Sequence, residues 1–138
     1  MYGQIWDWHT LEGPCVRKRN GLYYCFYSGG CYENETYGVD YGVAESVMGP
    51  YTEAGNEFGP RVLKTVVGEV VGPGHNSIVE GPDGESEFLI YHAWDLEMTA
   101  RRMCMDPLIW TEDGPRCLGP TWVPQLLQTG AVPLASAL

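Results

Sequence analysis

An Asn20-Gly21 pair lies between two strand-like runs, Cys15–Arg19 and Leu22–Ser28. Asn-Gly in this setting is the strongest short-range signal for a β-hairpin, because both central residues of a type I′ turn need a positive φ. The second run is rich in Tyr, Cys and Phe, so it predicts an inner strand with both faces covered. The Gly13-Pro14 break ahead of the hairpin keeps the backbone irregular and would let Glu12 point into a cavity. A solvated loop carboxylate is the alternative, since Glu is rarely buried.

Short strands separated by Gly- and Pro-rich turns continue along the chain, which predicts an all-β fold. One repeated pattern supports two similar units, because Tyr23–Ser28 corresponds to Phe88–Ala93 about 65 residues later. Four antiparallel strands in each unit describe a propeller blade, and they also fit a β-sandwich. The predicted strands are Cys15–Arg19, Leu22–Ser28, Gly38–Ser46 and Arg61–Val67, then Ser77–Glu80, Glu87–Ala93, Arg101–Trp110 and a short one near Arg116–Leu118. The predicted single domain, residues 1–138, has blade-like repeats at about 12–68 and 72–119 and an extended tail at 120–138.

Composition sets outer limits on function. The 138 residues are enough for one domain, and 18 Gly with 10 Pro disfavour long helices. A net charge of −10 without a basic stripe argues against nucleic acid as a partner. No apolar run is long enough to span a membrane, and the first residues resemble no signal peptide, so no membrane partner and, by default, a cytoplasmic location are expected. The five cysteines are odd in number and lack a CxxC spacing, so neither a disulfide framework nor a zinc knuckle is predicted.

Four motifs together resemble glycoside hydrolase family 43. They come in the family's order and cover most of residues 6–115: Leu11-Glu12-Gly13-Pro14 with the hairpin, Tyr41–Ser46 with Gly49-Pro50-Tyr51, Gly72–Ser77, and Tyr91–Trp94 with Arg101–Trp110. The resemblance implies a five-bladed β-propeller, of which this chain covers only the third and fourth blades. The expected fold class is therefore two four-stranded antiparallel blades, a partial propeller.

The resemblance also implies roles for individual residues in an inverting reaction. Such enzymes place a general acid and a general base on opposite sides of the scissile bond. Glu12 matches the general acid of the family. The base is an Asp of the first blade, and a second-blade Asp orients the acid; neither partner is evident here, so the base is expected to be missing. Asp7 does not stand in the base motif, although Asp7, Asp40 and Asp95 would be the first candidates if the chain alone were active.

The remaining candidate residues are ligands of sugar or metal. In the resembling family a His at the position of His75 points into the central channel, where calcium held mostly by water is one reading and a hydrogen-bonded channel His the other. The resembling family tends to place an Arg at the start of this strand, where it reaches toward the sugar or the acidic cluster. Arg101 is favoured over Arg102 for this role, because the two face opposite ways, and an edge-strand charge is the alternative. His92 and the aromatic Trp8 are further substrate contacts, unless they only pack. No cofactor is expected to be required.

The expected function is hydrolysis of arabinose- or xylose-containing glycans, an oligo- or polysaccharide being the partner. A non-catalytic carbohydrate-binding or assembly β module is the alternative. Two blades cannot close a ring, so either self-association or a partner that supplies the missing blades is expected.

Overall fold

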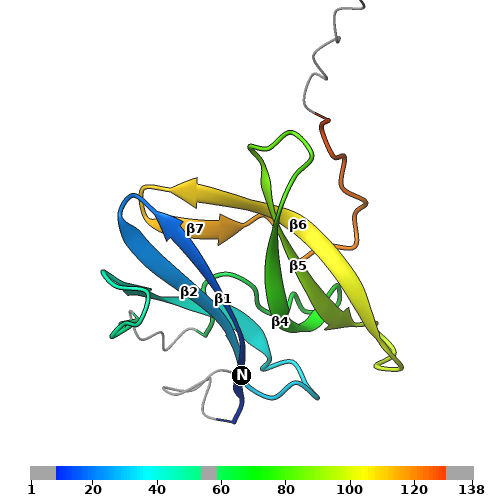
Figure 1. Ribbon diagram of the computed structural model, residues 1–138. Helices are drawn as coiled ribbons and strands as arrows, with labels where there is room; N and C mark the ends of the chain where they lie inside the picture. The colour runs from blue at the N-terminus through cyan, green and yellow to red at the C-terminus, as the bar shows by residue number, and fades with distance from the viewer. Residues whose placement is uncertain (1–8, 54–58, 130–138) are drawn as a thin grey trace, which may run out of the picture.

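The computed structural model describes residues 9–53 and 59–129 of the chain. Seven strands and no helix are found in these ranges, and all neighbouring strands are antiparallel. Figure 1 shows two sheets set side by side, with the C-terminal segment leading away from the second. The first sheet has the order β1 (Leu11–Arg19), β2 (Leu22–Gly29), β3 (Gly38–Ala44). The second has the order β4 (Val71–Glu80), β5 (Glu87–Trp94), β6 (Arg101–Thr111), β7 (Gly114–Cys117).

The predicted hairpin joins β1 to β2. Asn20 has a φ of 50° and Gly21 a φ of 83°, which are the two positive values that a type I′ turn needs. Arg19 pairs with Leu22 directly beside the turn, and Cys15 pairs with Phe26 further along. The Asn-Gly signal therefore fixed both the turn and the strand register.

The first sheet has one strand fewer than expected. The prediction of a strand at Arg61–Val67 is wrong, because this segment contacts β3 at a single bridge between Val39 and Leu63. Its far end curls into a tight turn closed by a bridge between Val66 and Val70, with Gly68 at a φ of 79°. Because this turn begins only three residues after Leu63, the segment cannot continue its pairing with β3 as a strand.

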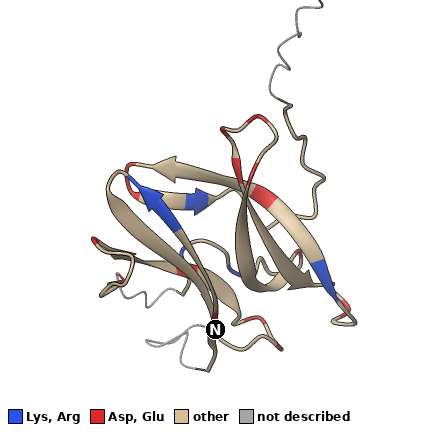
Figure 2. Ribbon diagram, viewed as in Figure 1, with Lys and Arg blue, Asp and Glu red and all other residues tan. Residues whose placement is uncertain are grey.

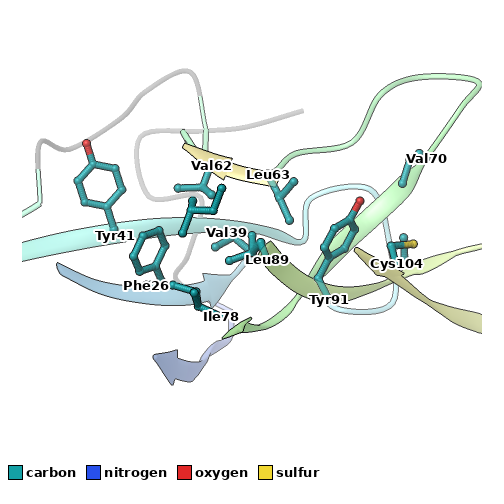
Figure 3. Close-up of a cluster of buried hydrophobic side chains, with 12 residues drawn as sticks. Phe26, Val39, Tyr41, Val62, Leu63, Val70, Ile78, Leu89, Tyr91 and Cys104 are labelled. Carbon is teal, nitrogen blue, oxygen red and sulfur yellow. The ribbon is translucent and has the colours of Figure 1, made fainter. Parts of the chain in front are cut away.

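The hydrophobic core lies between the two sheets (Figure 3). Phe26 and Leu89 are completely buried there, one from the central part of each sheet. Trp110 packs edge-on against Phe26 and Tyr24, with ring centroids 6.2 and 4.9 Å apart. The prediction that β2 is covered on both faces is only half right, since Tyr27 and other residues of its second face remain partly exposed.

An arginine–glutamate pair fastens one sheet to the other. Arg17 of β1 donates from Nε to Oε1 of Glu87 over 3.1 Å and from Nη2 to the carbonyl of Ile78 over 2.7 Å. Trp110 Nε1 donates to the second oxygen of Glu87 over 2.6 Å. Because both carboxylate oxygens have donors, the pair sets the relative position of the sheets and hence of the residues that β1 and β4 carry.

The segment after β7 is held by a buried carboxylate. Asp106 accepts hydrogen bonds from Tyr91 Oη (2.6 Å), from the amide and hydroxyl of Thr121 (3.0 and 2.6 Å), and from Gln125 Nε2 (3.0 Å). Trp122 Nε1 donates to the carbonyl of Glu69 over 2.8 Å. The first part of the segment after β7, residues 121–125, therefore lies against the second sheet.

We expect Asp106→Ala to lower the free energy of unfolding by about 1–3 kcal/mol or more. The reason is that the buried hydroxyl of Tyr91 would lose its acceptor, and an unpaired buried donor costs about that much. Urea unfolding measures the loss. Asp113→Ala is the matched control, because Asp113 is 83% exposed and its ion pair among the described residues is a surface pair with Arg116. Equal stability of the two variants would show that Asp106 does not hold the fold together.

Charged residues are unevenly distributed over this frame. In Figure 2 the acidic residues gather mainly in the turns, while Lys and Arg lie on β1, in the segment between β3 and β4, at the start of β6 and on β7. Among the described residues, no helix has the length and apolar character needed to cross a membrane.

Candidate functional site

Glu12 lies near the start of β1, where the strand is irregular. The register with β2 shifts between Glu12 and Cys15, and Gly13 has a φ of 62°. Such a bulge re-aims the side chains next to it. The side chain of Glu12 is 37% exposed, and its Oε1 accepts a hydrogen bond from Tyr37 Oη over 2.7 Å. The carboxyl group is thus partly open to a ligand and partly held by the protein.

His75 occupies a similar irregularity on β4. The register with β5 shifts on both sides of Gly74, and His75 itself has a φ of 53°. A non-glycine residue in this left-handed region costs about 1–3 kcal/mol and needs support from its surroundings. The backbone amide of His75 finds that support in Ser28 Oγ, at 2.8 Å. The resulting geometry brings His75 Nδ1 to 3.8 Å from Glu12 Oε1.

Tyr37 joins these two bulges from the loop before β3. It is completely buried, although its hydroxyl reaches Glu12. Its ring lies against Gly74, where an added Cβ would come within 2.1 Å of the ring. Its other neighbour is the ring of His92, stacked at 5.8 Å and 10°. Tyr37 therefore connects the carboxyl group on β1 with the histidine on β5.

Arg101 and two aromatic residues extend the site along the second sheet. Arg101 Nη1 lies 3.5 Å from His92 Nε2, and the rings of His92 and His75 are stacked at 6.2 Å. The guanidinium group of Arg101 also lies 5.8 Å from the ring of Tyr32 and 5.6 Å from that of Trp94. Arg102, by contrast, pairs with Asp95 at 3.4 Å, away from these rings.

Two hollows border the group of polar residues. A cleft of about 450 Å³ is formed against the first sheet, and an open groove of about 620 Å³ lies along the second. The cleft is lined by Leu11, Glu12, Pro14, Cys25, Tyr27, Gly42, Tyr51 and Glu53. The groove includes His75, His92 and Arg101. Glu12 and His75 line different hollows, although Glu12 Oε1 and His75 Nδ1 lie only 3.8 Å apart.

The surroundings of His92 shift the pKa of its imidazole. Burial lowers the pKa of His92 to about 4, and the neighbouring Arg101 and His75 side chains act in the same direction, whereas Glu12 opposes them. The neutral ring suits the contact between Arg101 and Nε2, which acts as an acceptor only when it carries no proton.

We expect the contribution of His92 to stability to disappear as the pH falls from about 6.5 through about 4. Over this range the unfolded chain takes up a proton at His92 and the folded chain does not, so acid favours unfolding. Urea unfolding of the wild type and of His92→Asn at several pH values measures the difference. The difference in the free energy of unfolding between the wild type and His92→Asn should become smaller as the pH falls. A difference that does not change with pH would contradict the prediction.

The structure brings together four of the five residues predicted for the site: Glu12, His75, His92 and Arg101. The fifth, Trp8, lies outside the described residues, as does Asp7. Of the other suggested bases, Asp40 is fully buried against Arg61, and Asp95 accepts hydrogen bonds from Thr99 within a turn. Neither of them lines the cleft that contains Glu12.

Two residues of the site were missed by sequence reasoning. Tyr37 precedes a strand in a polar loop, and nothing in its local sequence signals a contact with residue 12. Glu53 lines the same cleft as Glu12, and its Oε2 accepts a hydrogen bond from Tyr27 Oη over 2.6 Å. It follows a Gly-Pro turn without any motif. Both contacts depend on how separate strands meet in three dimensions.

The donor set around His75 does not fit a protein cage for calcium. Calcium prefers six to eight oxygen ligands, and here one imidazole that is 57% exposed stands near a single carboxyl group. Within the described ranges no three His, Cys, Asp or Glu side chains are grouped so that they could hold a metal ion.

Comparison with known proteins settles the family. Residues 3–115 match the profile of "Glycosyl hydrolases family 43". The chain belongs to this family. The four motifs had pointed to it, and that prediction is confirmed. A β-D-galactofuranosidase of Aspergillus niger is 34% identical over 107 residues, 75% of this chain and 30% of that protein. The extracellular endo-α-(1→5)-L-arabinanase 1 of Bacillus subtilis is 30% identical over 114 residues, 77% of this chain and 34% of that protein.

Solved structures of the family share the fold. The crystal structure of a thermostable family 43 glycoside hydrolase has a TM-score of 0.75 and 34% identity, covering 85% of this chain and 38% of that one. This likeness confirms the predicted class, an all-β fold of antiparallel propeller blades. This chain spans about a third of the length of the curated relatives that it matches. By their names, these two relatives are glycosidases that act on β-D-galactofuranosides and on α-(1→5)-linked arabinan.

Proposed function

We propose that this chain provides the general acid of an inverting glycoside hydrolase that cleaves arabinose- or xylose-containing glycans. The observation that carries the proposal is the placement of Glu12. In a member of family 43, it lies at a bulge beside a cleft, held by Tyr37 and facing His75. In this role Glu12 would give its proton to the glycosidic oxygen as the bond to the anomeric carbon breaks, and the leaving alcohol would take the bonding electrons.

The substrate contacts follow from the second hollow. We assign Arg101 and His92 to the sugar, because they line the open groove that begins at His75, and we assign Trp8 as an aromatic contact. Arg101 has no carboxylate within ion-pair distance among the described residues, so its donors remain available for hydroxyl groups. No cofactor takes part in the proposed reaction. A calcium ion near His75 would have to be held mostly by water.

The sugar class is supported by the chemistry of the curated relatives. One is a galactofuranosidase, and the other acts on arabinose units linked through O5. An arabinose residue that is linked through O5 cannot close a six-membered ring with that oxygen, so it too is a furanose. We therefore place arabinofuranosides first among the candidate substrates and xylosides second.

We infer that the general base is not among the described residues. Glu53 is the described carboxylate that shares a cleft with Glu12, and Tyr27 already donates to it. The reaction would then need further blades in addition to these two. Met103 is 80% exposed on the face of β6 that carries Arg101, and a further blade could cover it at the end of the groove.

The experiment is a hydrolysis and binding assay of two samples. One is the chain alone, and the other is a completed assembly in which the chain replaces the matching third of the Bacillus subtilis arabinanase. Turnover of an aryl α-L-arabinofuranoside by the completed assembly, above that of the arabinanase with this third deleted, supports the proposal. Binding of arabino-oligosaccharides without any turnover would instead identify a non-catalytic carbohydrate-binding module.

A further inference from the structure

We propose that Tyr37 is a positioning residue that fixes the rotamer of Glu12 and directs the proton of the acid to Oε2. The part of this inference that concerns the proton rests on the proposed function, whereas the part that concerns the rotamer does not. The inference starts from one contact. The side chain of Tyr37 is fully buried, yet its hydroxyl donates a hydrogen bond to the carboxyl group of Glu12 at the edge of a cleft.

The ring of Tyr37 cannot change its place. On one side the backbone of Gly74 is so near that any side chain there would collide with the ring, and on the other the imidazole of His92 is stacked at 5.8 Å. A buried aromatic ring confined on both faces holds its hydroxyl at a fixed point. Burial raises the pKa of Tyr37 well above its ordinary value, and Glu12 adds to this, so the hydroxyl stays a donor at any working pH.

Glu12, by contrast, has a long side chain that is 37% exposed and stands on a bulged strand. Within the described residues both of its polar contacts, with Tyr37 and with His75, are made to Oε1. Oε2 is thereby left for a ligand. A hydrogen bond donated to Oε1 occupies that oxygen, so a proton on the carboxyl group would reside on Oε2.

The contact also fits the charge that develops in the reaction. When Oε2 gives its proton to the leaving oxygen, Glu12 becomes a carboxylate, and Tyr37 then donates to a charged acceptor. Hydrogen bonds to charged acceptors are about twice as strong as neutral ones. The same bond therefore orients the acid before proton transfer and stabilises its carboxylate afterwards.

The first test uses the chain itself and needs no turnover. Three-bond NMR couplings of Glu12, in protein labelled at Glu, report whether its side chain occupies one rotamer. We expect a single rotamer in the wild type and averaged couplings in Tyr37→Phe. Tyr91→Phe is the matched control, since Tyr91 is also buried and donates to a carboxylate, Asp106, over 2.6 Å. It should lose stability while Glu12 keeps its wild-type couplings. Unchanged couplings in Tyr37→Phe, or averaging already in the wild type, would overturn the inference.

The second test compares leaving groups in the completed assembly. Misplacement of a catalytic group can cost up to about 100-fold in rate. We expect Tyr37→Phe to lower kcat about 10- to 100-fold for arabino-oligosaccharides, with KM unchanged and an activated aryl arabinoside largely spared. A merely structural loss would lower both rates equally and would overturn the inference. Glu12→Gln in the same assay separates the two proposals: if Glu12→Gln shows no leaving-group dependence, the proposed function fails, and the coupling measurement still decides the role of Tyr37.

Discussion

Glu12→Gln is expected to lower the cleavage of arabino-oligosaccharides by the completed assembly about 10²- to 10⁴-fold, the usual contribution of a general acid. The alcohol released from an oligosaccharide is a poor leaving group and needs a proton as the bond breaks. An activated aryl group leaves without one, so the same substitution should cost it far less. A difference between the two substrates is therefore the signature of acid catalysis, because damage to binding or folding would affect both.

Glu80→Gln serves as the control for this prediction. Glu80 lies on the exposed end of β4, away from both hollows, and its substitution should leave both rates unchanged. Steady-state rates with a dinitrophenyl arabinofuranoside and with arabinotriose, measured for each variant, give the comparison. Similar and mild losses on both substrates in Glu12→Gln would remove Glu12 from the role of acid.

The parts of the fold that sequence reasoning predicted correctly depend on local chemistry. The turn at Asn20-Gly21 needs only two residues that tolerate a positive φ, and it sets the pairing of β1 with β2. The apolar pattern of Glu87–Ala93 likewise identified β5, because an inner strand must be apolar whatever surrounds it. The strand expected at Arg61–Val67 failed for the opposite reason. Its sequence has strand propensity, but a tight turn between Val66 and Val70 bends it away from β3.

In the site, too, some residues could be predicted from the local sequence and others could not. Glu12 and His75 stand next to Gly-Pro and Pro-Gly breaks that are visible in the sequence, and the bulges that turn the two side chains toward each other occur there. Tyr37 stands beside no such break. Its position follows from two contacts remote in sequence, the hydroxyl with residue 12 and the ring with Gly74. Contacts between residues so far apart in the sequence arise from the packing of the sheets, and no local sequence pattern predicts them.

The chain alone is expected to show no measurable hydrolysis of aryl arabinosides or xylosides. Inversion needs a base to activate water as well as an acid, and loss of one member of such a pair costs orders of magnitude in rate. Among the described carboxylates, Asp40 is buried against Arg61 and Asp95 is held within a turn. Glu53 lies in the cleft of Glu12 but is bonded to Tyr27. We therefore expect the base to be supplied by a residue other than these three.

The same parts of the molecule predict how the chain behaves in solution. Apolar side chains such as Met103 on β6 and Val123 in the segment after β7 are 80% and 65% exposed. Apolar patches of this kind mark interfaces, so self-association or binding to a chain that carries further blades is expected. Light scattering of the pure chain tests the predicted association, and turnover assays on the same sample test the predicted lack of hydrolysis. A stable monomer with ordinary turnover would contradict them and would require a base within this chain. Glu53→Gln and Asp7→Asn are then the first variants to make, since Glu53 shares the cleft with Glu12 and Asp7 precedes it by only five residues.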